Sequence, residues 1–236
     1  MGKFWDKLRR VQDKTRPFCT AIVPAAGSST RMGGQDKLLA DLCGTPVLMR
    51  TLCAIDKTEL VDEIIVATGS VPRTMPMIPG FEKTLTFTEL LKDKKEVGDK
   101  VLFIGGGQSS CEAAYDMLLN YGKHPIIVEY AGDLVAAQAT CLANTSYLRD
   151  AMEYHKVPVY LHSTVTEITD KGCTVKNVQT GETTFVECDS VVNGIGFVPT
   201  PVGGKDNKKA YRVGDCVAIG NLRTVIWRAW AVCMKI

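Results

Sequence analysis

The stretch KVLFIGGGQSSCEAA, residues 100–114, decides the fold. Its apolar start predicts a buried strand, its glycines predict a tight turn, and the pattern over 109–122 predicts a helix that stops at Gly122. HPIIVEYA, residues 124–131, then reads as the next strand. Strand, turn, helix and strand together span about 30 residues, the length of a βαβ unit. The sequence therefore predicts a parallel sheet at this point.

The turn matches the dinucleotide-binding pattern G-x-G-x-x-G at Gly105, Gly107 and Ser110, with serine as the small third residue. Gly105 permits the tight turn, and Gly107 lets the backbone approach a pyrophosphate at the positive end of the helix. Glu129 ends the next strand, where a carboxylate accepts hydrogen bonds from a ribose 2′-hydroxyl and repels a 2′-phosphate. This favours NAD(H) over NADP(H); the alternative is a strand–helix turn that binds nothing. The predicted cofactor contacts are Gly105, Gly107, Gln108, Ser109, Ser110 and Glu129.

A second candidate lies near the C-terminus, in YRVGDCVAIGN, residues 211–221. Gly214 and Asp215 follow a predicted strand and precede a predicted helix from residue 224 to 234. An aspartate in that place can bond the hydroxyls of a flavin, although Gly-Asp alone is a common turn.

Four segments together carry a family resemblance: VATGSVPR (66–73), the glycine turn, VVNGIGFVPT (191–200) and YRVGDCVAIGN. From about residue 65 onward the chain resembles the C-terminal region of the flavin-dependent pyridine nucleotide–disulfide oxidoreductases, in particular the large enoate and dienoyl-CoA reductases. The resemblance implies hydride transfer from NADH to FAD. It implies that Gly105, Gly107, Glu129 and Gly196 belong to cofactor sites and that the FAD contacts are Ala67, Thr68, Gly69, Gly214 and Asp215. No G-x-G-x-x-G precedes residue 65 and no C-x-x-C exists, so the FAD site is incomplete.

The N-terminal stretch VPAAGSSTRMGGQDK, residues 23–37, points to different chemistry. A strand leads into a loop of small residues with Arg31 and Lys37, and exposed N–H groups with two cations form a cradle for a triphosphate. Residues 18–67 resemble the nucleotidyltransferases, most closely 2-C-methyl-D-erythritol 4-phosphate cytidylyltransferase. The resemblance implies Mg²⁺, charge stabilisation by Arg31 and Lys37, and CTP contacts at Ala25, Ala26, Gly27 and Ser28. The downstream acidic motif of that family is absent.

Strands and helices alternate, which predicts an α/β protein. We expect a Rossmann-like NAD(H)-binding domain at residues 99–198, with three layers and a mainly parallel sheet with antiparallel hairpins. Residues 18–98 and 199–236 are expected to form a partial α/β nucleotide- or FAD-type domain behind an extension of residues 1–17. The C-terminal strand should complete the sheet of this partial domain, leaving an exposed edge or apolar patch.

Composition narrows the partners. The chain has 236 residues and a net charge of +2, with 45% hydrophobic and 23% charged residues. Nothing in this charge recommends a nucleic-acid partner, and no apolar run approaches the roughly 18 residues of a membrane span. The partners expected from the motifs are therefore small nucleotide ligands, with no nucleic acid and no membrane. Nine scattered cysteines without a C-x-x-C argue against a disulfide framework or a metal cluster. With no secretory signal in the first residues, we expect a cytoplasmic protein.

Three interpretations stay open. The chain is an NAD(H)-binding fragment of a flavoprotein-type oxidoreductase, a cytidylyltransferase, or a fusion of two gene pieces without a complete activity. The strand within VDEIIVATGSVPR, residues 61–73, fits both families that the chain resembles, because each needs a buried β-branched run that ends in small residues at this point.

Overall fold

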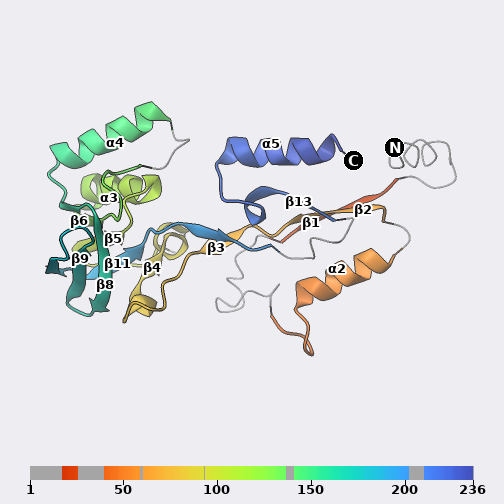
Figure 1. The fold of residues 1–236 in the computed structure, drawn as a ribbon, viewed down its shortest axis with the longest axis horizontal. Helices are drawn as coiled ribbons and strands as arrows, with labels where there is room; N and C mark the ends of the chain where they lie inside the picture. The colour runs from red at the N-terminus through yellow and green to blue at the C-terminus, as the bar shows by residue number, and fades with distance from the viewer. Residues whose placement is uncertain are drawn as a thin grey trace. The chain divides into compact units, whose positions relative to one another are not determined.

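The computed structural model describes residues 18–25, 40–58, 61–92, 94–136, 141–201 and 210–235. They form two compact units, coloured along the chain in Figure 1. The first unit comprises residues 1–71 and 197–236, and the second comprises residues 72–196. The division thus falls at residue 71 rather than at the expected residue 98. The physical reason is that residues 78–86 pack into the core and onto the sheet edge of the second unit.

A five-stranded parallel sheet forms the centre of the second unit. In spatial order its strands are β4 (Leu85–Thr86), β11 (Ser190–Asn193), β5 (Lys100–Ile104), β6 (His124–Val128) and β7 (Val159–Tyr160). The central strand β5 buries Val101, Leu102 and Phe103 completely. Such a continuous apolar run is typical of a parallel strand that is covered on both faces.

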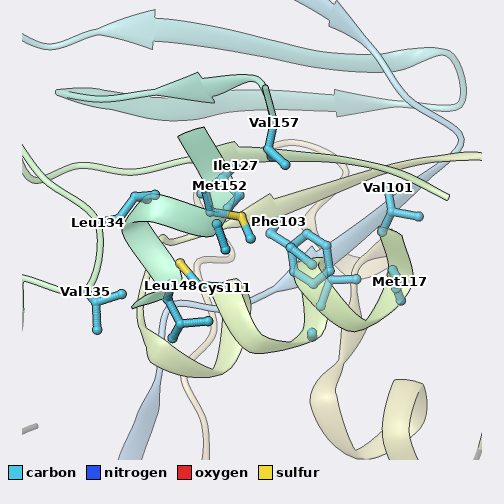
Figure 2. Close-up of a cluster of buried hydrophobic side chains, with 14 of the residues drawn as sticks. Val101, Phe103, Cys111, Met117, Ile127, Leu134, Val135, Leu148, Met152 and Val157 are labelled. Carbon is cyan, nitrogen blue, oxygen red and sulfur yellow. The ribbon is translucent and has the colours of Figure 1, made fainter. Parts of the chain in front are cut away.

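Two helices cover one face of this sheet. Helix α3 (Gln108–Tyr121) follows the glycine turn directly and ends at Gly122, which has the left-handed φ of 61°. Helix α4 (Leu142–Tyr154) packs against it, and Figure 2 shows Cys111, Leu148 and Met152 of the two helices in one apolar cluster with Phe103. This layer is the larger part of the hydrophobic core of the second unit.

A three-stranded antiparallel sheet packs on the other face. Its spatial order is β10 (Thr183–Glu187), β9 (Gly172–Asn177) and β8 (Ser163–Thr169). A short 3₁₀ turn, η2 (Phe81–Lys83), adds Phe81 to the apolar cluster beneath these strands. Helices, parallel sheet and antiparallel sheet make three layers, so the predicted fold class is confirmed.

The first unit has a smaller sheet in the order β1 (Thr20–Pro24), β2 (Glu63–Ala67) and β13 (Ala210–Arg212). Both pairs are parallel, so the C-terminal strand completes this sheet as predicted. Helix α2 (Val47–Lys57) packs Leu48 and Leu52 onto Ile64 and Val66 of β2.

The remaining elements of the first unit are short or exposed. Strands β3 (Ser70–Pro72) and β12 (Phe197–Pro199) pair with each other, and a 3₁₀ turn, η4 (Gly214–Cys216), follows β13. Helix α5 (Leu222–Cys233) buries no residue, and Trp227 and Trp230 are 64% and 57% exposed. An apolar patch was expected in this unit, and α5 carries one.

The predicted extension of residues 1–17 lies outside the described residues. In the part of the chain that the structure describes, none of the helices has the length and apolar character needed to cross a membrane.

Candidate nucleotide-binding site

The three glycines after β5 are held for different reasons. Gly105 has a φ of +98°, and an added Cβ would stand 2.7 Å from the carbonyl oxygen of Gly194. A Cβ on Gly106 would stand 2.5 Å from Cδ2 of Leu134. At Gly107 the φ is −70°, which any residue adopts, and no atom lies within 4 Å of an added Cβ. The fold itself therefore requires glycine at 105, crowds position 106 and leaves position 107 free, with open space in front of Gly107.

Helix α3 begins at this open space. Gly107 is its N-cap and contributes no side-chain cap, and the first turn contains no acidic residue. The side chain of Gln108 is turned along the helix, where its amide donates to Glu112 at 2.7 Å. The positive end of the helix and the N–H groups of residues 108 and 109 are thus available to an anion.

Ser110 occupies the third position of the pattern at a close contact. It is 1% exposed, and a Cβ on Gly194 would lie 2.2 Å from its Oγ. This Oγ is buried and makes no hydrogen bond within the described residues. A small side chain is needed here because helix α3 approaches the loop after β11 so closely.

Glu129 stands beside the glycine turn. One carboxylate oxygen accepts a hydrogen bond from the N–H of Gly106, and the other accepts from the N–H of Ala131 at 2.6 Å. Each oxygen keeps a further lone pair, and the side chain is only partly buried. The structure thus brings the predicted acidic residue and the predicted turn together, with capacity left for a hydroxyl donor.

Two residues near this turn were not singled out from the sequence. Burial, and next the negative charge of Glu129, raises the pKa of the Cys111 thiol to about 12, so this thiol stays protonated below the turn. Buried Asn193 donates to the carbonyl of Arg73 at 2.8 Å and accepts from the N–H of Ile195 at 3.2 Å. Its only sequence signal is a polar residue that closes an apolar strand. Asn193 fixes the loop that leads to Gly196, whose carbonyl accepts from Arg73 at 2.9 Å.

In the first unit, the predicted flavin contacts lie after β2. The hydroxyl of Thr68 donates to the carbonyl of Thr200, and the hydroxyl of Thr200 donates to the carbonyls of Thr68 and Gly69 at 2.8 and 2.9 Å. These polar groups are therefore used within the unit. Ala67 is half-buried, and its carbonyl accepts from the N–H of Ala25.

Gly214 and Asp215 also lie at the end of β2. Gly214 has a φ of +75°, and the N–H of Val213 donates to the carbonyl of Val66 at 3.0 Å. Oδ1 of Asp215 is buried and has no hydrogen-bond partner among the described residues. This oxygen is a free acceptor for a hydroxyl group of a ligand.

Of the predicted CTP loop, only Ala25 belongs to the described residues, and it is buried. Five of its members fall outside them: Ala26, Gly27, Ser28, Arg31 and Lys37. The described residues contain no group of three or more histidine, cysteine, aspartate or glutamate side chains that could hold a metal ion.

The sequence model of one family, described as pyridine nucleotide-disulphide oxidoreductase, matches residues 44–232. The chain belongs to this family. Its fold, Rossmann-like with parallel and antiparallel layers, is the fold that the family uses to bind FAD and NAD(P).

Two reductases are similar to this chain. The cinnamate reductase of Clostridium sporogenes is 33% identical over 180 residues, which are 74% of this chain and 26% of that protein. The solved structure of a 2-naphthoyl-CoA reductase has a TM-score of 0.62 at 26% identity and covers 74% of this chain and 27% of that one. The chain therefore spans about a quarter of the length of these reductases.

A third relative belongs to a different class of enzyme. The 2-C-methyl-D-erythritol 4-phosphate cytidylyltransferase of Symbiobacterium thermophilum is 39% identical over 83 residues. These residues are 35% of this chain and 34% of that enzyme. Because this share and the 74% matched by the cinnamate reductase together exceed the whole chain, the two alignments have residues in common.

Family membership implies two cofactors, and the residues fit them unequally. For NAD(H), the open space at Gly107, the uncapped start of α3 and the carboxylate of Glu129 form a matching set. For FAD, Asp215 offers a free acceptor, but the sequence ahead of β2 has no G-x-G-x-x-G for the adenosine half. The residues present fit a nicotinamide dinucleotide and fit only part of a flavin dinucleotide.

Proposed function

We propose that the second unit binds NAD(H) and forms the nicotinamide side of a flavoprotein-type oxidoreductase. The observation that carries this proposal is the open space in front of Gly107, at the start of α3 and beside Glu129. Glycine at 107 has no role in packing, so a ligand that needs close backbone approach explains it.

The residues of the second unit act by binding and orienting. The first N–H groups of α3 hold the pyrophosphate, and Glu129 accepts from the ribose hydroxyls while its charge repels a 2′-phosphate. Bound NADH would supply a hydride. Cys111 takes no part in the chemistry, because its raised pKa keeps it a thiol.

Calorimetric titration with NADH and NADPH tests the proposal. We expect NADH to bind and NADPH to bind about tenfold more weakly, a difference of roughly 1.4 kcal/mol. The absence of heat with NADH at millimolar concentration contradicts the proposal, and equal affinities contradict the role of Glu129.

The family's chemistry also includes transfer of electrons to FAD, which requires that the chain bind FAD. Since the adenosine half of the site is missing from the sequence, we expect the purified chain to be colourless and to release added FAD on gel filtration. A stoichiometric flavin that stays on the column-purified protein contradicts this expectation.

The cytidylyltransferase similarity supports a second candidate function. That enzyme class would release pyrophosphate from CTP in the presence of Mg²⁺ and methylerythritol phosphate, with Arg31 and Lys37 as the predicted catalytic cations. We expect no release, because the sequence lacks the acidic motif that holds the metal. Measured release that Lys37→Ala abolishes would establish this function instead.

We infer that both similarities come from a fusion of two gene segments that meet in β2. Two observations support this: the chain is similar to two different classes of enzyme, and β2 pairs with β1 on one side and β13 on the other. The tryptic peptide of residues 58–73 spans the join. We expect that mass spectrometry of the source cells will not detect this peptide, because a fused polypeptide that is not expressed yields no peptide across the join. Its detection shows one expressed polypeptide and turns the search towards a joint function.

A further inference from the structure

Two cysteines of the second unit lie in contact. Cys173 lies in β9, and Cys188 follows the last residue of β10. Their sulfur atoms are 3.9 Å apart, and both are free thiols that are 0% and 5% exposed. Cys173 pairs with Val186 across the two strands, so Cys188, two residues further on, projects from the same face.

Of the two cysteines, Cys188 lies nearer to solvent. Cys188 lines a hollow of about 400 Å³ together with Lys100, Lys171 and Asp189. Cys173 does not line this hollow and lies deeper in the apolar cluster. A small polar reagent that enters this hollow therefore meets Cys188 before Cys173.

We propose that Cys188 and Cys173 form a disulfide when a peroxide enters this hollow. The Cys188 sulfur attacks one peroxide oxygen, the O–O bond breaks, and water leaves, which makes a sulfenic acid on Cys188. The Cys173 sulfur then attacks the Cys188 sulfur, the S–O bond breaks and a second water leaves. Two thiols and one peroxide thus give one disulfide and two waters, with sulfur oxidised and peroxide oxygen reduced.

The electrostatics of the pair give the two sulfurs different roles. The contact between the two sulfurs raises the pKa of Cys173, and burial raises it further, while the same contact lowers the pKa of Cys188. The thiolate is the attacking species, so the accessible Cys188 reacts first and the covered Cys173 resolves it. The sulfurs must approach from 3.9 Å to the roughly 2.0 Å of a disulfide bond, which side-chain rotation and a small strand shift supply.

The new bond would tie β9 to the segment that enters the central sheet. Asp189 follows Cys188 at once; its N–H donates to the carbonyl of Lys100 at 2.8 Å, and its carboxylate accepts from the N–H of Lys100 at 2.7 Å. Oxidation would therefore fix the antiparallel layer to the start of β5, away from the glycine turn. We expect NADH affinity to stay unchanged while the second unit becomes harder to unfold.

Peptide mapping of the whole protein tests the proposal. After treatment with hydrogen peroxide, free thiols are blocked under denaturing conditions and the chain is cut with trypsin. Cys173 and Cys188 fall in separate tryptic peptides, residues 172–176 and 177–205. We expect a linked pair of these peptides, lighter by two hydrogens than their sum and separated by a reductant. Recovery of both only as blocked thiols, while the exposed Cys141 is oxidised, overturns the proposal.

Two variants assign the order of reaction. In Cys173→Ser the linked pair should be lost and Cys188 should be trapped as a sulfenic acid by dimedone. In Cys188→Ser, Cys173 should remain a thiol under the same treatment. If Cys173 is instead oxidised as readily as in the wild type, Cys188 is not the sulfur that the peroxide meets. The wild-type mapping decides the proposal even where a variant folds poorly.

Discussion

At the scale of single residues, three adjacent glycines separate packing from binding. Gly105 is fixed by its positive φ and by the backbone of Gly194, and Gly106 is crowded by the side chain of Leu134, whereas Gly107 has free space and an ordinary φ. A substitution at Gly107 therefore changes what a ligand meets and leaves the fold unchanged, which makes it a clean probe.

We predict that Gly107→Ala lowers NADH affinity at least about tenfold, or roughly 1.4 kcal/mol, with little change in melting temperature. The added methyl group would occupy the space through which a pyrophosphate approaches the backbone. Calorimetric titration and a thermal melt measure the two effects. Gly105→Ala is the matched contrast, since its Cβ would meet the Gly194 carbonyl and should destabilise the second unit. Unchanged NADH binding by Gly107→Ala counts against the site.

We predict that Glu129→Gln lowers both the stability of the second unit and its affinity for NADH. The carboxylate accepts from two backbone N–H groups, while an amide offers one acceptor oxygen and turns its NH₂ towards the other N–H. A lost acceptor costs about 1–3 kcal/mol, which urea unfolding measures, and NADH titration measures the affinity. Glu153→Gln, at an exposed position in α4, is the control. A variant with wild-type stability and affinity would falsify the assignment of Glu129.

We predict that Cys111 makes stability fall in alkali. Its folded pKa of about 12 exceeds the ordinary value of 9.0, so the unfolded chain loses this proton first. The contribution is complete below pH 9 and is lost as the pH rises towards about 12. The free energy of unfolding of wild type should approach that of Cys111→Ala by ~2 kcal/mol between pH 9 and about pH 11. A gap that stays constant over this range contradicts the prediction.

The residue pattern predicted the glycine turn and Glu129 because both lie in one local βαβ unit. It did not predict that Glu129 bonds the backbone of Gly106 and Ala131, since these bonds depend on how two loops fold. The role of Asn193 was not predicted for the same reason, since its partners Arg73 and Ile195 come together only in the folded protein.

At the scale of elements, periodicity predicted the strands and helices well and their ends less well. The stretch NTSYLRDAMEYHK predicts a helix over residues 144–156 with Asn144 or Thr145 as its cap. The observed helix α4 begins at Leu142, and Thr145 lies inside it, with its hydroxyl donating to the Leu142 carbonyl at 3.0 Å. Burial of Leu148 and Met152 fixes this helix, and no side-chain cap exists at Cys141. Capping residues alone are therefore a weak guide to where a packed helix begins.

Helix α5 is the opposite case, because a cap stabilises it and no buried side chain does. The carboxamide oxygen of Asn221 accepts from the N–H of Thr224 at 3.1 Å. We predict that Asn221→Ala costs about 1 kcal/mol in the first turn of α5 and speeds amide hydrogen exchange there several-fold. NADH affinity should not change. Asn120→Ala, at an exposed position within α3, is the control; equal effects of both variants on α5 would refute the role of the cap.

At the scale of the whole molecule, the two units have unequal cores. The second unit buries two large apolar clusters, whereas the described part of the first unit buries one cluster of only five residues: Ala25, Leu48, Leu52, Ile64 and Val66. Hydrophobic burial is the main favourable contribution to folding, so the first unit should be the less stable one.

We predict two transitions in differential scanning calorimetry, with the first unit unfolding at the lower temperature. Saturating NADH should raise only the upper transition, because a ligand that binds one unit stabilises that unit. At a hundred times the Kd the gain is about 2.7 kcal/mol. A single transition that moves as a whole with NADH is incompatible with this prediction.

The order of the two units along the chain has a consequence for loop entropy. The second unit is inserted into the first, and the N–H of Arg73 bonds the carbonyl of Gly196 at 2.9 Å where the chain enters and leaves it. A folded insert therefore delivers its two ends as neighbours. An unfolded insert of about 125 residues is instead a flexible loop, and bringing its ends together costs roughly 4 kcal/mol of conformational entropy. Such a penalty is comparable to the stability of a small core, so prior folding of the second unit favours assembly of the first, whose third strand β13 follows the insert along the chain.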